Sequence, residues 1–175
     1  MAMPPLVPKD LQQALACVRV SPDDFDLGAE VAALRAGDAQ VGAVVSFVGT
    51  VREWSPDPAA VMTLEHYPGM TERSIAELIV QARQRFDVRG VRVIHRVGPL
   101  AVTDQIVLVA VSSAHRHEAF QCAAFLMDWL KTRAPFWKRE QAQGEARWVD
   151  ARESDDEAAA RWHLPGSPAS AGGRP

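Results

Sequence analysis

The clearest chemical potential in this sequence lies in a cluster of cations around a proline and two aromatic residues. The segment runs from Lys131 to Glu140 and reads KTRAPFWKRE, in a chain whose formal net charge is −3. Pro135 lacks a backbone N–H and clashes with a preceding helical turn, so no regular helix continues through it. We therefore expect a helix end followed by a bent loop, which can direct Lys131 and Lys138 toward a common point. Lysine serves as an acid, a base or a nucleophile where burial or neighbouring positive charge lowers its pKa.

Two aromatic residues distinguish this segment from an ordinary charged loop. A run of charges is more often a solvated surface loop than a site. Phe136 and Trp137 favour burial, and they would draw the flanking charges to the edge of a pocket. The sequence therefore favours a lysine-containing pocket over a solvated basic loop.

Further cations are expected at the ends of other elements, where a rigid scaffold presents functional groups. Arg52 follows a predicted strand and a glycine, and His115 and Arg116 stand at the start of a predicted helix. A helix N-terminus beside an arginine suits a phosphate group. Taken singly, Arg52 is more often a surface charge and His115 a helix-terminal residue with a local hydrogen bond. No glycine-rich nucleotide-binding motif and no GxSxG elbow occurs in the chain.

Composition describes an ordinary globular chain of 175 residues, long enough for one domain with a hydrophobic core. The slightly acidic balance argues against a general attraction to nucleic acid or to an anionic membrane, and no apolar run is long enough to cross a bilayer. The first five residues lack the pattern of a secretion signal, so we expect a cytoplasmic protein. Cys17 and Cys122 form no CxxC pair and no HExxH motif occurs. We therefore expect neither a metal nor a cofactor.

Periodicity predicts an α+β fold in which hairpin-like strands and separate helices share one domain. The predicted helices cover 27–34, 71–86 and 115–132, and the predicted strands cover 41–48, 61–67, 91–97, 106–111 and 148–149. Thr71 is expected to cap the second helix. The third should bury a stripe containing Phe120, Ala123, Ala124, Met127 and Leu130. We expect a partly ordered lead-in over 1–20, a domain over 21–152 and a C-terminal tail over 153–175 that is largely disordered after 163.

Several strings in this chain, in the same order, resemble the catalytic (large) subunit of molybdopterin synthase. They are GAVVSFVGTVR at 42–52, LEHYPGMTE at 64–72, VIHRVG at 93–98, SAHR at 113–116, FLMDWLKTRAPFWKRE at 125–140 and WV at 148–149. The resemblance spans about 38–162, and its lysine-rich string is highly specific.

This resemblance implies an α/β hammerhead fold with a mixed, largely antiparallel sheet and packed helices. It implies a sulfurtransferase of molybdenum cofactor biosynthesis, which converts cyclic pyranopterin monophosphate (precursor Z) to molybdopterin by installing a dithiolene. The sulfur would come from a thiocarboxylate on the C-terminal Gly-Gly of a small ubiquitin-like subunit. A homodimer of large subunits, with a small subunit at each end, would form a heterotetramer.

The resemblance also assigns roles to individual residues. Lys131 and Lys138 would be catalytic, the first in contact with the reacting carbonyl or pterin and the second stabilising negative charge. Substrate binding would involve both lysines together with Thr50, Val51, Arg52, His115, Arg116, Arg139 and Glu140. Arg152 is a weaker candidate for substrate binding. The channel for the partner's tail would be walled by Phe47, Phe136 and Trp137. Some family members carry a lysine in place of Thr50, so its phosphate contact would here be a weaker hydrogen bond.

Two alternatives stay open on the sequence alone. One is a non-catalytic module that binds the small sulfur-carrier subunit without turnover, against which the presence of both Lys131 and Lys138 argues. The other is an enzyme that acts on a different phosphorylated metabolite. An assay that depends on the thiocarboxylated partner separates all three.

Overall fold

The computed structural model describes residues 8–149 and 153–162 of the chain. Its elements in chain order are α1 (Lys9–Leu15), β1 (Val18–Ser21), α2 (Leu27–Arg35), β2 (Ala43–Thr50), β3 (Val61–His66), α3 (Met70–Arg85), β4 (Gly90–Arg96), β5 (Gly98–Leu100), β6 (Gln105–Ser113), α4 (Arg116–Arg133), β7 (Phe136–Ala142), β8 (Glu145–Val149) and α5 (Glu153–Ala160). The predicted helices and strands are therefore confirmed, with shifts of a few residues at their ends.

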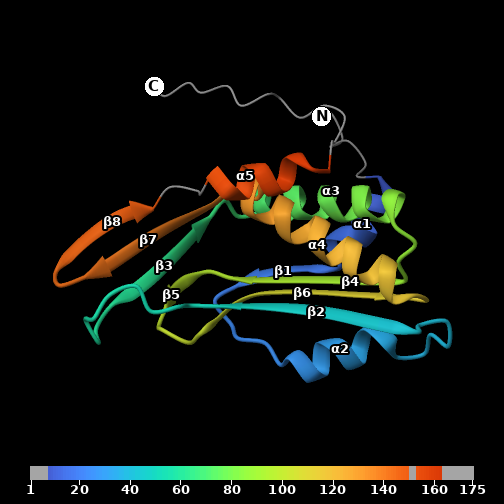
Figure 1. The fold of residues 1–175 in the computed structure, drawn as a ribbon, viewed down its shortest axis with the longest axis horizontal. Helices are drawn as coiled ribbons and strands as arrows, with labels where there is room; N and C mark the ends of the chain where they lie inside the picture. Colours follow the sequence, from blue (N-terminus) through green and yellow to red (C-terminus); the bar gives the residue numbers. More distant parts are fainter. Residues whose placement is uncertain (1–7, 150–152, 163–175) are drawn as a thin grey trace, which may run out of the picture.

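One sheet, with strand order β1-β4-β6-β2, forms the centre of the molecule (Figure 1). β1 pairs with β4 in parallel, whereas β4–β6 and β2–β6 are antiparallel. The apolar run of β6 is buried on both faces, as predicted: Val107, Val109 and Val111 face the main core, while Leu108 and Ala110 face a smaller cluster. Helices α1, α3, α4 and α5 cover the main-core face, and α2 covers the other (Figure 1).

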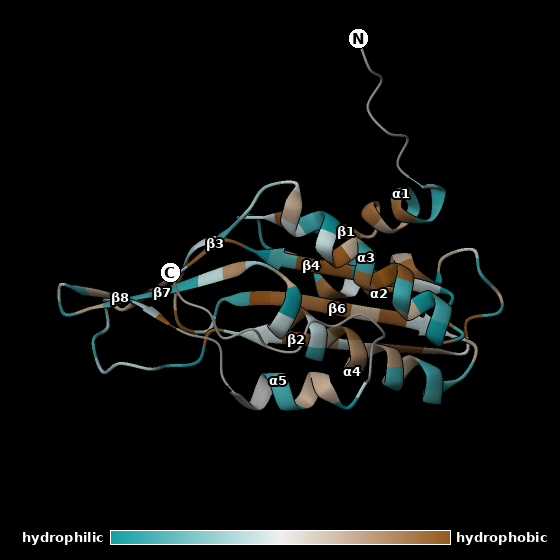
Figure 2. Ribbon diagram, turned by 90° about the horizontal axis from the view of Figure 1, so that it is seen from above, coloured by the Kyte–Doolittle hydropathy of each residue, from teal (hydrophilic) through white to brown (hydrophobic). Residues whose placement is uncertain are grey.

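The second sheet, with strand order β5-β3-β7-β8, is antiparallel throughout and extends from one end of the molecule (Figure 2). Its apolar face buries Met62 and Leu64 of β3 against Val51 and Leu100. Val97 alone separates β4 of the first sheet from β5 of the second. The second sheet is thus tied closely to the first, and it carries Lys138 on β7.

The buried face of α4 differs from the predicted stripe. Phe120 is 60% exposed, whereas Phe125 is fully buried and Trp129 is nearly so. The reason is that Phe125 packs edge-on against Phe86, at the end of α3, and against Trp162, which follows α5. These partners cover a side of α4 that a helix lying on a single sheet would leave to solvent.

Packed structure also continues past the predicted domain boundary at 152. α5 contacts α4, and Ala159 and Trp162 are buried. The Trp162 indole N–H donates to Asp128 Oδ2 at 2.7 Å, and Arg161 pairs with the same oxygen at 2.6 Å. The first ten residues of the predicted tail therefore include a helix of the domain, while the predicted disorder after 163 lies outside the described residues. In the lead-in, α1 buries Leu11 and Ala14.

Candidate active site

A tight turn at Pro135 joins the helix that carries Lys131 to the strand that carries Lys138. α4 ends at Arg133, and Ala134 is extended at φ −74° and ψ 125°, as expected before proline. The Phe136 N–H donates to the Ala134 carbonyl at 2.9 Å, which closes a three-residue turn centred on Pro135. β7 begins at Phe136, so Lys138 and Arg139 lie in a strand and not in the predicted loop. Pairing with β3 and β8 on either side keeps this segment extended.

The two lysines differ in their surroundings. Lys131 is exposed in the last turn of α4, where the helix dipole favours a cation. Lys138 is 35% exposed, and its Nζ lies 3.0 Å from Glu140 Oε1. Residues two apart in a strand share a face, which is why the ammonium reaches this carboxylate.

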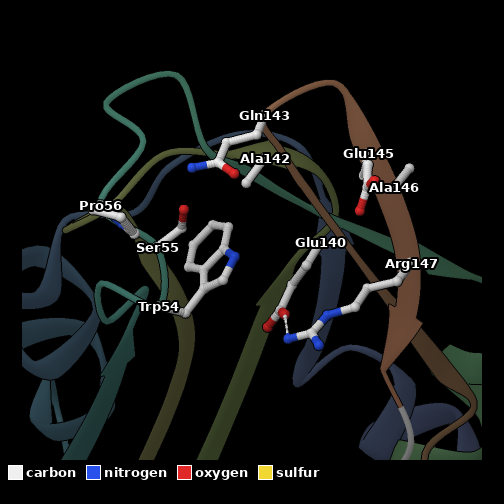
Figure 3. A pocket seen from close by; sticks show the side chains of 9 residues that line it. All are labelled: Trp54, Ser55, Pro56, Glu140, Ala142, Gln143, Glu145, Ala146 and Arg147. Atoms are coloured by element: carbon white, nitrogen blue, oxygen red, sulfur yellow. Dashed lines mark hydrogen bonds and ion pairs between the residues drawn. The ribbon is translucent and has the colours of Figure 1, made fainter.

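Glu140 joins two cations. Its second oxygen accepts a hydrogen bond from Arg147, directly across the ladder on β8, at 3.0 Å (Figure 3). Burial alone would raise the pKa of Glu140, but the hydrogen bonds from Lys138 and Arg147 outweigh it and hold that pKa below its ordinary value. Glu140 was predicted to bind substrate. In the structure its two carboxylate oxygens pair with Lys138 and Arg147, so Glu140 holds the Lys138 ammonium in place.

A cavity of about 330 Å³ lies beside this network, between the β2–β3 loop and the β7–β8 hairpin (Figure 3). Its lining consists of Trp54, Ser55, Pro56, Glu140, Ala142, Gln143, Glu145, Ala146 and Arg147. Asp57 fixes the loop, because its Oδ2 accepts a hydrogen bond from the Gln143 N–H at 2.6 Å. Sequence reasoning missed this cavity and the role of Arg147. The available signal was Trp54, a large aromatic residue within a proline- and aspartate-containing loop.

The predicted phosphate-binding residues separate into two groups in the structure. Thr50 and Arg52 are exposed at the end of β2, whereas the Val51 side chain is buried in the core cluster with Leu64. His115 and Arg116 are exposed at the start of α4, which follows the far end of β6.

The ladder register places these two groups at opposite ends of the first sheet. Ala43 pairs with Ser113, and Thr50 pairs with Gln105. The seven residue steps from Ala43 to Thr50 correspond to roughly 23 Å of strand. One chain therefore does not bring His115 and Arg116 to Arg52.

The three predicted channel residues do not share one surface either. Phe136 stacks on His95, with ring centroids 3.8 Å apart, while its neighbour Trp137 points to the opposite face of β7 and contacts Tyr67. Phe47 is exposed on β2, in the other sheet. The alternation of strand side chains thus prevents Phe136 and Trp137 from lining the same channel within one chain. Burial lowers the pKa of His95 to about 4, so its imidazole is neutral near pH 7.

Residues 8–149 and 153–162 provide neither a cluster of metal ligands nor a membrane-spanning helix. No group of three or more His, Cys, Asp or Glu side chains there is arranged to hold a metal ion. Of the helices in this part of the chain, none is both long and apolar enough to span a bilayer. Cys122 is fully buried, and burial raises the pKa of its thiol to about 12.

A two-sheet α+β fold whose helix–strand turn presents two lysines defines an α/β hammerhead protein with a lysine-containing site. The sequence profile of the MoaE protein family matches residues 20–133. A relative from Ralstonia nicotianae (strain GMI1000), named molybdopterin synthase catalytic subunit, is 58% identical over 149 residues, which are 84% of each chain. The chain belongs to the MoaE family.

Solved structures agree with this assignment. Molybdopterin cofactor biosynthesis protein E from Burkholderia multivorans is 52% identical, with a TM-score of 0.72 over 84% of this chain and 96% of that one. Molybdopterin synthase from Staphylococcus aureus is 27% identical, with a TM-score of 0.69 over 75% of this chain and 96% of that one. The described fold is therefore that of the family.

Proposed function

We propose that this chain is the catalytic subunit of a molybdopterin synthase. It transfers sulfur from the C-terminal thiocarboxylate of a small ubiquitin-like subunit to cyclic pyranopterin monophosphate, and it thereby forms the dithiolene of molybdopterin. The observation that carries this proposal is the 58% identity to a relative of that name over 84% of both chains. The proposal keeps the cytoplasmic location predicted from the sequence.

In this proposal Lys131 and Lys138 perform the chemistry. Lys131, exposed at the end of α4, contacts the reacting carbonyl or the pterin as an acid, a base or a transient amine nucleophile. Lys138 stabilises developing negative charge, and Glu140 fixes its ammonium at 3.0 Å. The geometry supports these roles because the Pro135 turn connects the two elements directly.

Phosphate recognition is proposed to use residues from two copies of the chain. Arg52 lies at one end of the first sheet, and His115 and Arg116 lie at the other end. Within a single chain these cations are therefore too far apart to bind one phosphate group. A homodimer in which the α4 start of one copy approaches the β2 end of the other would complete the set. With one small subunit on each copy, the assembly is a heterotetramer.

The deciding experiment mixes this chain with thiocarboxylated small subunit and precursor Z, and measures molybdopterin formation. We expect product with the wild-type chain and none when the thiocarboxylate is replaced by a carboxylate. Tight binding of the small subunit without product would instead support the non-catalytic module. Absence of any interaction with that subunit would favour an enzyme for another phosphorylated metabolite.

A further inference from the structure

A single buried hydroxyl links the start of α3 to the turn between the two lysines. Thr71 is the second residue of α3 and its side chain is fully buried. Its Oγ accepts a hydrogen bond from the Tyr67 N–H at 3.0 Å and donates one to the Pro135 carbonyl at 3.2 Å. The bond to Pro135 spans 64 residues of sequence. Loss of this donor would leave the part-buried Pro135 carbonyl without the Thr71 hydrogen bond, at a cost in free energy, so this contact helps to fix the turn.

Capping does not account for this hydroxyl. Sequence reasoning assigned Thr71 as the helix cap, but α3 begins after Gly69, whose φ is 81°. The Glu72 carboxylate accepts a hydrogen bond from the Gly69 N–H at 2.7 Å, which supplies the cap contact at this end. The donor hydrogen of Thr71 therefore serves the Pro135 turn and not its own helix.

The turn is held from its other side by an aromatic contact. The Phe136 ring stacks on His95 of β4, with an interplanar angle of 17°. In the strand ladder, Phe136 of β7 lies opposite His66 at the end of β3. The hydroxyl and the imidazole together fix the residues on either side of the Pro135–Phe136 bond, midway between Lys131 and Lys138.

We propose that Thr71 is a positioning residue for the sulfur-transfer reaction, because its hydroxyl sets the direction in which the Pro135 turn presents Lys131 relative to Lys138. This inference rests on the proposed function. Thr71 does not touch substrate; it acts through the backbone carbonyl of Pro135. Displacement of a reacting group by about 1 Å can lower turnover by about a hundredfold, so the contact is sufficient to control the rate.

Two matched variants separate the hydroxyl from the bulk of the side chain. Thr71→Val keeps the branched shape and removes the hydroxyl, whereas Thr71→Ser keeps the hydroxyl and removes a methyl group. We expect Thr71→Val to lower kcat about tenfold or more, with KM for the small subunit changed by less than about twofold. Thr71→Ser should keep kcat within about threefold of wild type. Wild-type turnover by Thr71→Val, or losses in both variants that simply follow their melting temperatures, would overturn the inference.

Amine labelling tests the same geometry without turnover. The chain contains three lysines, and Lys9 on α1 serves as an internal standard for Lys131 and Lys138. Limited acetylation with acetic anhydride, read by peptide mass spectrometry, should show a change of at least about threefold at Lys131 or Lys138 relative to Lys9 in Thr71→Val only. Equal ratios in all three proteins would sink the inference. If Thr71→Val shows the labelling change but the wild-type chain makes no molybdopterin, the proposed function is rejected and the geometric link is retained.

A variant on the other side of the contact covers the case in which Thr71→Val does not fold. Pro135→Ala loosens the same turn, because it removes the ring that fixes φ. We expect it to lower kcat while the chain remains folded and binds the small subunit. Pro135→Ala with wild-type kcat and labelling would overturn the inference by itself.

Discussion

Replacement of Glu140 by glutamine tests whether one carboxylate balances two cations in this protein. Glu140→Gln keeps the size of the side chain and removes the charge that faces Lys138 and Arg147, each 3.0 Å away. By Coulomb's law a charge pair at this distance is worth about 1.4 kcal/mol in water and about 5.5 kcal/mol at an effective dielectric constant near 20. The Glu140 side chain is 9% exposed, but those of Lys138 and Arg147 are 35% and 76% exposed. Solvent screening therefore favours the lower end, and we expect a loss of about 1–2 kcal/mol.

The lowered pKa of Glu140 determines how this loss of stability should change with pH. The pKa of Glu140 in the folded chain lies below its ordinary value of 4.5, so the charged carboxylate stabilises the fold at higher pH. That contribution is fully present above pH 4.5 and is lost as the pH falls through the folded-state pKa. The difference in stability between wild type and Glu140→Gln should therefore shrink toward zero under acidic conditions.

Urea unfolding followed by tryptophan fluorescence measures both effects. Glu77→Gln is the matched control, because it removes a carboxylate whose partner, Arg73, lies 3.1 Å away with both side chains mostly exposed. That variant should lose no more than about 0.5 kcal/mol. The reasoning is refuted if Glu140→Gln is as stable as wild type near pH 7, or if its deficit persists unchanged in acid.

Three further predictions concern the lysines, the last helix and a buried histidine. Lys131→Ala and Lys138→Ala should each nearly abolish molybdopterin formation while the chain remains folded, with Lys9→Ala as the active control; normal turnover in either would remove that assignment. Trp162→Ala should lower the free energy of unfolding by about 3–5 kcal/mol because its buried indole packs on the core, and a loss below about 1 kcal/mol would contradict this packing. The pKa of His95 falls from 6.5 when the chain is unfolded to about 4 when it is folded, so stability should decrease as the pH is lowered between these values. His95→Phe keeps an aromatic stack and should flatten that slope; an unchanged slope in urea titrations would exclude His95 as its source.

Local patterns in the sequence were sufficient to predict the main elements. The apolar run 106–111 identified β6 as a strand buried on both faces, and the proline after Ala134 located the end of α4. In both cases the information lies within a few adjacent residues, because burial and backbone restriction act on the segment itself. The resemblance to the family assigned the catalytic role to Lys131 and Lys138, and that role stays a prediction.

Features that depend on distant partners were not predictable in this way. Phe136 and Trp137 were assigned to one channel, but the strand pairing of β7 places them on opposite faces. The extra helix α5 was missed because its acidic and small residues resemble a tail, and only its packing against α4 reveals its place in the domain. Arg147 acquires its role through a register with Glu140 across a hairpin. Such relations arise from tertiary contacts that one sequence does not display.

The interleaving of the two sheets has a consequence for how the chain reaches its native state. From β2 to β7, successive strands belong alternately to one sheet and the other. All strands of the first sheet lie before residue 114, whereas the second sheet is complete only when β7 and β8 are present, so the set of strands for the first sheet is synthesised in full before that for the second. Because each sheet is interrupted by strands of the other, most of the paired strands lie far apart in sequence, which favours slow folding.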